Sequence, residues 1–159
     1  SIIIFVHPAN QMIQRIQTIY LLIAVGAFIT EFFSPLLKSS QSAVTGMYQD
    51  AQVMVKEDQI SLVLLAVTCL LSILSIFLFK NRNVQKQLIL ITIILLLAGN
   101  GYTGYAILAP TQEITSLSQA SIFPGLGSFM PLIALIVLVL AYRGVSKDEK
   151  IVKSMDRLR

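Results

Sequence analysis

The 159-residue chain has little of what catalytic and metal-binding sites are built from. It contains one histidine, one cysteine and no tryptophan, and only 13% of its residues are charged. With His7 and Cys69 alone, zinc, haem and iron–sulfur sites are excluded unless another subunit supplies ligands, and no disulfide can form within the chain. Phosphate-binding glycine loops, His-Glu-x-x-His motifs and Cys-x-x-Cys motifs are also absent. We therefore expect no metal, no cofactor and no enzymatic activity.

Hydrophobic residues make up 55% of the chain, whereas an ordinary soluble domain has about a quarter of its residues charged. A helix that rises about 1.5 Å per residue needs about 20 apolar residues to cross a bilayer. Four segments reach this length, at about 16–37, 60–79, 88–109 and 124–142. The start of the fourth segment is the boundary that the pattern defines least. The sequence predicts an all-α membrane protein with four transmembrane helices.

The basic residues predict the orientation of these helices, because loops rich in Lys and Arg stay in the cytoplasm. Ten of the twelve Lys and Arg lie before the first span, between the second and third, or after the fourth. Lys38 and Lys56 are the exceptions. The net charge of +4 therefore marks one side of a membrane and does not indicate nucleic-acid binding. We expect an antiparallel bundle in the lipid bilayer, with both termini in the cytoplasm.

The segment before the first span has two alternative interpretations. Arg15 followed by an apolar run resembles a signal peptide, but the run is longer than a signal core and no Ala-x-Ala follows it. Residues 1–11 are expected to be a non-native or misassigned extension, because Met12 is a suitable start. The expected organisation is this extension, a membrane domain over 12–145 and a cytoplasmic tail over 146–159.

Each span carries a stripe of small or polar residues at helical spacing. In a bilayer, helices associate through small residues and interhelical hydrogen bonds, so we expect the stripes to face one another. The four stripes are Gln17, Tyr20, Ala24, Ala27, Glu31, Ser34 and Lys38; Ser61, Thr68, Ser72 and Ser75; Thr92, Gly99, Thr103 and Ala106; and Gly127, Pro131, Ala134 and Ala141. In the loops, residues 52–56 permit a short strand that could pair with 113–118.

Glu31 is the one ionisable residue well inside a span. A charge at membrane depth is costly, so such a residue is a candidate functional site. Asn100 and Tyr102 of the third span reach a similar depth from the antiparallel side. We favour a structural carboxylate, held near the interface by a hydrogen bond or by Lys38. A proton- or cation-coupled site is the alternative.

Three glycines interrupt the third span between residues 98 and 105. They permit either close helix packing or a helix break that exposes backbone carbonyls to a cavity. We favour close packing, with Tyr102 and Tyr105 near the membrane interface, because small residues are the usual means of helix contact.

The charged tail matches a capping box at Ser146-Lys147-Asp148-Glu149, which predicts that a short amphipathic helix starts there. Its apolar face would lie near anionic lipid head groups. We favour a solvated end that fixes the topology; docking to a partner is the alternative. The residues that would form such a docking surface are Arg15, Lys147, Lys150, Lys153 and Arg157.

Residues 12–22, 79–82 and 142–159 resemble the family called domain of unknown function 4293. The resemblance covers residues 12–159 and implies a small four-span inner-membrane protein of Bacteroidetes-type bacteria. Residues before Met12 fall outside the family pattern. The family has no assigned activity to transfer to this chain.

The leading expectation is a non-enzymatic accessory or assembly subunit of a membrane complex, because the distinctive side chains gather at the cytoplasmic edges. Its partner would be another membrane protein or a second copy of the chain. The alternative is a small oligomeric transporter, coupled to protons or cations through Glu31. A lipid-modifying enzyme ranks third, since it would depend on the outer-loop residues Asp50, Lys56, Glu57 and Asp58.

Overall fold

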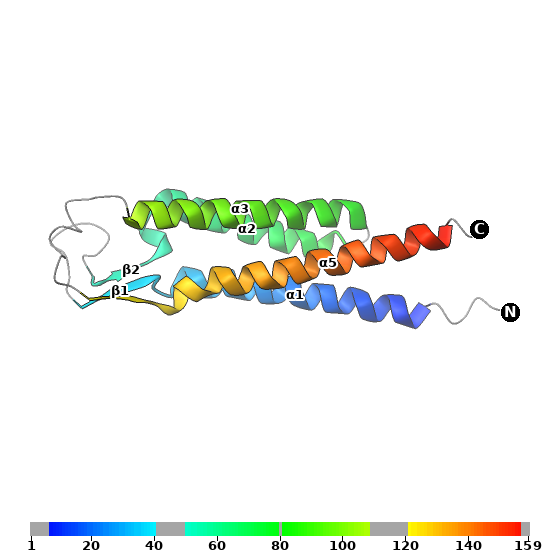
Figure 1. Ribbon diagram of the computed structural model, residues 1–159, viewed down its shortest axis with the longest axis horizontal. Helices are drawn as coiled ribbons and strands as arrows, with labels where there is room; N and C mark the ends of the chain where they lie inside the picture. The colour runs from blue at the N-terminus through cyan, green and yellow to red at the C-terminus, as the bar shows by residue number, and fades with distance from the viewer. Residues whose placement is uncertain (1–6, 41–49, 80, 109–120, 157–159) are drawn as a thin grey trace.

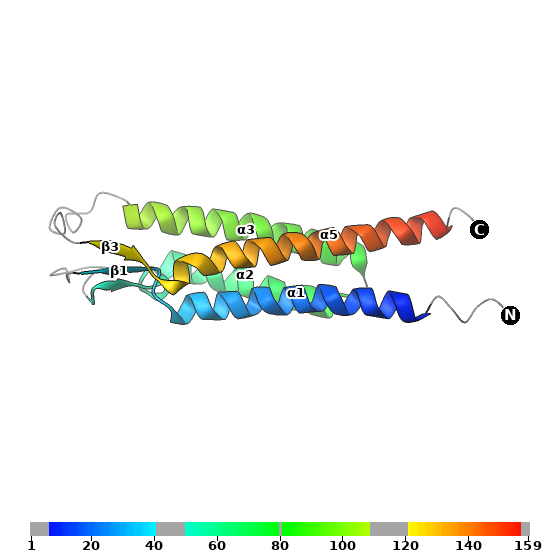
Figure 2. The same ribbon diagram turned by 60° about the horizontal axis from the view of Figure 1, so that its bottom comes forward.

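Four long helices form a slender bundle in which each runs antiparallel to the next along the chain (Figures 1 and 2). They are α1 (His7–Phe33), α2 (Gln59–Phe77), α3 (Arg82–Leu108) and α5 (Met130–Asp156). Around the bundle, α1 packs against α2, α2 against α3, α3 against α5 and α5 against α1. The computed structural model describes residues 7–40, 50–79, 81–108 and 121–156, and for residues 7–15, 108 and 148–156 it describes the backbone alone. The α1 start and the α5 end lie at the same end of the bundle.

The boundaries of the first two spans follow from local chemistry. Helix α1 ends at Phe33, four residues before the predicted end, because Pro35 disfavours a helical conformation at the preceding Ser34. Helix α2 nearly matches its predicted range. It begins after Asp58, whose carboxylate Oδ2 accepts a hydrogen bond from the Ser61 backbone N–H at 2.7 Å and so caps the first turn.

The last two helices differ more from the expected ranges. Helix α3 begins at Arg82, six residues earlier than predicted, and continues without a break to Leu108. At the start of the fourth span, Pro124 belongs to a strand, the 3₁₀ helix η2 (Leu126–Phe129) follows, and α5 begins at Met130. Helix α5 then passes through Ser146 to Asp156. The predicted helix restart at Ser146 is therefore wrong, and the buried Ser146 hydroxyl has no hydrogen-bond partner.

A small antiparallel sheet lies at the end of the bundle opposite to the start of α1 and the end of α5 (Figure 2). Its strand order is β2 (Gln52–Val53), β1 (Leu37–Ser39), β3 (Ile122–Pro124). In the central strand, Leu37 pairs with Val53 on one side and with Pro124 on the other. A strand within 52–56 is thus confirmed, and β1 and β3 complete its sheet. The expected partner segment, 113–118, lies outside the described residues.

Two glycines allow the sheet to close onto the end of α1. The backbone N–H of Gly125 donates to Leu36 O at 2.8 Å, and that of Gly127 donates to Pro35 O at 3.0 Å. The Ser128 hydroxyl also donates to Leu36 O. A Cβ atom on Gly125 would lie 2.1 Å from Pro35 O, so any side chain would push the two segments apart.

On α2, small hydroxyl side chains face the interior and large apolar side chains face outward, the reverse of a helix in a soluble protein. The buried residues of α2 are hydroxyl residues, which confirms the stripe predicted for that span: Ser61, Thr68, Ser72 and Ser75. Six of its large apolar side chains are exposed: Ile60, Val63, Val67, Leu70, Leu74 and Phe77. Thr68, Ser72 and Ser75 donate to carbonyls one turn back in their own helix, as Thr68 does to Leu64 O at 2.7 Å. Small side chains let the backbones approach closely.

The contact between α1 and α5 follows the same rule. Ala24 and Ala27 of α1, and Ala134 and Ala141 of α5, are buried as their stripes predict. Larger core side chains fill the space between the helices, among them Leu21, Phe28 and Leu138. With this arrangement, four helices are long and apolar enough to cross a membrane: Ile16–Phe33, Gln59–Phe77, Arg82–Ile107 and Leu126–Lys147.

The two glycine environments predict opposite responses to a methyl group. Gly125→Ala should destabilise the fold by about 1–3 kcal/mol or more, because its Cβ meets backbone that cannot yield easily. Gly101→Ala is the matched control, since nothing lies within 4 Å of a Cβ there, and alanine favours a helix by about 1 kcal/mol over glycine. Thermal unfolding in mild detergent, followed by far-UV circular dichroism, measures both. Equal Tm values for the two variants would contradict the close approach at Gly125.

Candidate functional site

The Glu31 carboxylate is buried inside the bundle. Its position four residues after Ala27 and three after Phe28 puts it on the inward face of α1, and only 4% of the residue is exposed. Oε2 is buried and has no hydrogen-bond partner, and none of the described residues forms an ion pair with the carboxylate. Lys38 does not fulfil the expected pairing role, because α1 ends at Phe33 and Lys38 lies exposed in β1.

A cavity of about 20 Å³ lies beside Glu31. Its polar lining comes from three helices: Glu31 of α1, Ser61 and Thr68 of α2, and Asn100 and Thr103 of α3. The remaining walls are apolar, among them Val55 of the 3₁₀ helix η1 (Val55–Glu57) and Leu65 of α2. A volume of roughly 10–15 Å³ in this measure accommodates one water molecule. The cavity is therefore large enough for a water molecule or one small ion.

The polar groups around this cavity offer mainly oxygen acceptors. Thr68 donates its hydroxyl proton to Leu64 O at 2.7 Å, and Thr103 donates to Gly99 O at 2.9 Å. The hydroxyls of Thr103 and Ser61 are hydrogen-bonded to each other at 2.9 Å. Asn100 Nδ2 donates to Leu96 O at 2.9 Å. The Thr68 proton is engaged within α2, and the single Thr103 proton goes either to Gly99 O or to Ser61 Oγ, so the lone pairs of these hydroxyl oxygens remain available to a cation.

An ionised carboxylate that faces acceptors without a donor is costly in an apolar interior. A proton on Glu31, or a small cation beside it, removes that cost. One carboxylate with neutral hydroxyl and amide oxygens is a hard-oxygen donor set that carries a single negative charge. In the part of the chain that the structure describes, no cluster of three or more His, Cys, Asp or Glu residues is present. The arrangement fits a proton or a monovalent cation.

The structure brings together some of the predicted polar residues and not others. Asn100 lines the cavity with Glu31, whereas Tyr102 is half-buried and is not among the lining residues. Ser61, Thr68 and Thr103 were expected as packing residues only; the signal for their second role was their hydroxyl chemistry on stripes that face Glu31.

Helix α3 is continuous across the glycine run, so the alternative of a helix break there is wrong. Close packing is confirmed at Gly99 alone, where an added Cβ would lie 3.4 Å from Leu64 Cβ. Around Gly101 and Gly104 nothing lies within 4 Å. Tyr105 is largely exposed.

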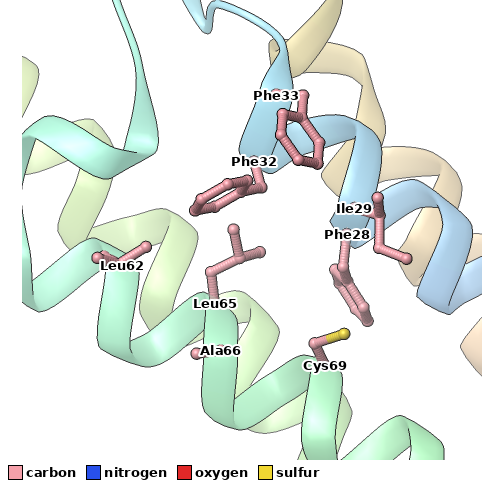
Figure 3. Close-up of a pocket in the computed structure, with 8 residues that line it drawn as sticks. All are labelled: Phe28, Ile29, Phe32, Phe33, Leu62, Leu65, Ala66 and Cys69. Atoms are coloured by element: carbon pink, nitrogen blue, oxygen red, sulfur yellow. The ribbon is translucent and has the colours of Figure 1, made fainter.

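An apolar groove of about 250 Å³ lies on the outside of the bundle between α1 and α2 (Figure 3). Phe28, Phe32 and Phe33 of α1 form one wall, and the Cys69 sulfur points toward Phe28 from the other. Leu65 of α2 lines both this groove and the Glu31 cavity. Cys69 is half-buried here, which agrees with its interpretation as a packing residue.

The charged residues at the two ends of the bundle are mostly exposed. At the sheet end, Asp50, Lys56 and Glu57 are exposed. Partial desolvation of the Glu57 carboxyl raises its pKa. At the opposite end, Lys147 is exposed, and Lys86 Nζ lies 5.9 Å from the centre of the Tyr142 ring, a cation–π distance. The side chains of the other predicted docking residues, Arg15, Lys150, Lys153 and Arg157, lie outside those described.

These features define a class: a four-helix bundle with helices of membrane-spanning length and a buried carboxylate facing a small polar cavity. The chain belongs to the family described as domain of unknown function (DUF4293), whose pattern it matches over residues 13–158. This confirms the resemblance noted from the two ends of the sequence. No curated protein and no solved structure matches the chain.

The unpartnered carboxylate predicts an unusual effect on stability. Glu31→Gln keeps the size of the side chain but removes the charge, so at alkaline pH and low salt it should stabilise the bundle by about 1–3 kcal/mol. The measurement is thermal unfolding in detergent by circular dichroism, with Glu57→Gln as the exposed-carboxylate control, for which a much smaller change is expected. A marked loss of stability in Glu31→Gln would mean that the carboxylate has a stabilising partner after all.

Proposed function

We propose that this chain is a multi-pass protein of the bacterial inner membrane, in which all four long helices cross the bilayer. The exposed large apolar side chains on every helix support this, because such surfaces are unfavourable in water. The distribution of Lys and Arg supports an orientation with both termini in the cytoplasm, and the start of α1 and the end of α5 lie at one end of the bundle (Figure 1). The sheet would then lie on the outer side.

Within this membrane protein, we propose that Glu31 is the binding site of a proton-coupled or monovalent-cation-coupled transporter. The single observation that carries the proposal is the buried Oε2 atom without a partner, beside a cavity lined by oxygen acceptors. Ionisable residues inside transmembrane segments are commonly parts of proton or ion pathways. The geometry thus favours the interpretation that ranked second from the sequence.

Binding at Glu31 changes the charge of the interior, which is the basis for coupling. With the site empty, the carboxylate contributes a negative charge without a donor; with a proton or cation bound, the interior becomes neutral. Two conformations that differ in how well they tolerate this charge would be populated differently in the two cases. The side chains on the bilayer-facing surface take no part in this step. We propose that the transporter is an oligomer of this chain.

The proposal predicts that cation or proton flux depends on Glu31. Purified protein in liposomes loaded with a pH-sensitive dye should dissipate an imposed proton or sodium gradient, and Glu31→Gln should reduce this activity to the level of empty liposomes. Glu57→Gln is the matched control, because its carboxylate is exposed at the sheet end, and it should behave as wild type. Undiminished flux in Glu31→Gln, or no flux from the wild type with either ion, would rule out this transport role.

A second candidate function, an accessory or assembly subunit of a membrane complex, is favoured by a separate observation. The first turns of α1 and the last turns of α5 extend together beyond the α2–α3 connection (Figures 1 and 2). Helix α5 continues nine residues past the membrane-length segment that ends at Lys147. We propose that this two-helix projection, with its basic residues, docks onto a partner in the cytoplasm. The two functions are compatible.

The docking proposal predicts the loss of a partner when the projection is shortened. Deletion of residues 148–159 leaves the span Leu126–Lys147 intact, so the protein should still insert and fold. Crosslinking in native membranes, followed by affinity purification and mass spectrometry, should recover a membrane-protein partner with the full chain and lose it with the truncated chain. Lys150→Glu together with Lys153→Glu tests the charge without shortening the helix. Identical recovery from all three proteins would refute docking through this end.

A further inference from the structure

The Glu31 cavity has a neighbour that leads toward the sheet. A second cavity, of about 10 Å³, lies between the start of α2, the end of α3 and the segment before η1. Val55, Ser61 and Thr103 line both cavities, and Asp58 lines the second one. Building on the proposed cation site, we propose that protons or monovalent cations reach Glu31 from the sheet end of the bundle, along a polar route formed by Asp58, Ser61 and Thr103.

Hydrogen bonds connect the polar groups along this route. The Asp58 carboxylate accepts from the Ser61 backbone N–H at 2.7 Å, which holds the carboxylate beside the first turn of α2. The Ser61 hydroxyl is bonded to that of Thr103 at 2.9 Å, so one oxygen from each of two helices faces the boundary between the cavities. Beyond Thr103, the lining continues with Asn100 and ends at Glu31. The two cavities thus share oxygen-bearing side chains, set among apolar residues such as Leu36 and Ile107.

Asp58 provides the charge at the outer end of the route. Its carboxylate is half-buried, between the exposed residues of η1 and the buried Ser61. A negative group at the mouth of a narrow, low-dielectric passage concentrates cations and excludes anions. Asp58 thus has two roles, capping α2 and selecting the sign of the permeating charge.

In the opposite direction from Glu31, large apolar side chains close the core around a few buried polar groups, and one of these, the Gln85 amide, donates to Ser75 O at 3.0 Å. Toward the termini, the inward faces of α1, α3 and α5 carry fully or almost fully buried residues, among them Leu21, Phe28, Ile89, Leu138 and Val145. The hydroxyls in this half, Ser72, Ser75 and Thr92, donate to carbonyls of their own helices and connect to no carboxylate. The bundle as it stands therefore gives Glu31 access to one side, and delivery to the other side requires these core side chains to separate.

Two buried serines on one face of α2 allow a matched test of this route. In a Cys69→Ala background, Ser61→Cys places a thiol on the route, and Ser75→Cys places one in the sealed half; the two native residues are 2% and 0% exposed. The probe is Ag⁺, a small cation that forms a silver thiolate and releases the thiol proton. The fraction of thiol that still reacts with maleimide after denaturation reports the extent of modification.

We expect Ag⁺ to modify the Ser61→Cys thiol roughly tenfold faster, or more, than the Ser75→Cys thiol, because a charged passage raises the local cation concentration. Asp58→Asn should slow the reaction at position 61 several-fold, since asparagine keeps the helix cap but removes the charge. Equal rates at the two positions, or faster reaction at position 75, would overturn the proposed route. If Ser61→Cys does not fold, Thr103→Cys and Thr92→Cys form a second pair on α3; because Thr103 is half-buried and Thr92 fully buried, the slowing by Asp58→Asn at position 103 is then the decisive measurement.

Oriented proteoliposomes then test the side of access. In vesicles where a C-terminal tag is protected inside, external Ag⁺ should reach position 61, and in vesicles with the tag outside it should not. Reaction from the tag side alone would overturn the route. The labelling does not depend on transport, so its failure is distinct from that of the proposed function: Glu31-dependent flux with equal labelling rejects only the route, and selective labelling without flux rejects only transport.

Discussion

Polar groups inside this bundle need hydrogen-bond partners within the protein, because they are shielded from water and an unpaired buried polar group is costly. The hydroxyl residues meet this constraint locally: Thr68, Ser72, Ser75, Thr92 and Thr103 each donate to the carbonyl one turn back. Hydroxyls bonded in this way act as small packing groups, which lets helix backbones approach closely. The interior therefore combines apolar core side chains with hydroxyls whose hydrogen bonds are satisfied within their own helices.

Glu31 does not meet this constraint, because one oxygen of its carboxylate is buried without a hydrogen-bond partner. Among the described residues, two buried side-chain atoms lack a hydrogen-bond partner, Glu31 Oε2 and Ser146 Oγ. An unpaired neutral hydroxyl costs a modest amount, whereas an unpaired carboxylate costs much more. Thr68 and Thr103 direct their hydroxyl protons to carbonyls or to Ser61 and not to Glu31, so their oxygens can serve a positive charge beside the carboxylate.

The sheet holds Glu31 and its polar neighbours near one end of the bundle. Strand β1 follows the end of α1 after only three residues, and Gly125 and Gly127 bring the start of the fourth span against Ser34–Leu36. These contacts hold the last turn of α1, and with it Glu31, next to the start of α2. Asp58, Ser61 and Thr103 gather near the sheet, whereas the other half of the bundle is packed with large apolar side chains. The molecule is thus asymmetric along its long axis.

The sequence by itself determined the four helices and much of the faces that they bury, because helical periodicity and hydrophobic length act locally and survive in any arrangement of neighbours. The family was identified from the resemblance of particular stretches of the sequence. The stripe of Ser61, Thr68, Ser72 and Ser75 was predictable in this way, and so was the burial of Ala24, Ala27, Ala134 and Ala141. Local patterns were misleading where a neighbour decides: the capping box at Ser146 is overridden by a continuous α5, and the glycines of α3 do not break it.

The tertiary structure alone decided that Glu31 pairs with neither Lys38 nor any other described residue and that it shares a cavity with Ser61, Thr68, Asn100 and Thr103. These residues come from three helices and span much of the chain, so their meeting depends on how the helices rotate and slide against one another. Packing sets those degrees of freedom, and no pattern along a single helix contains them.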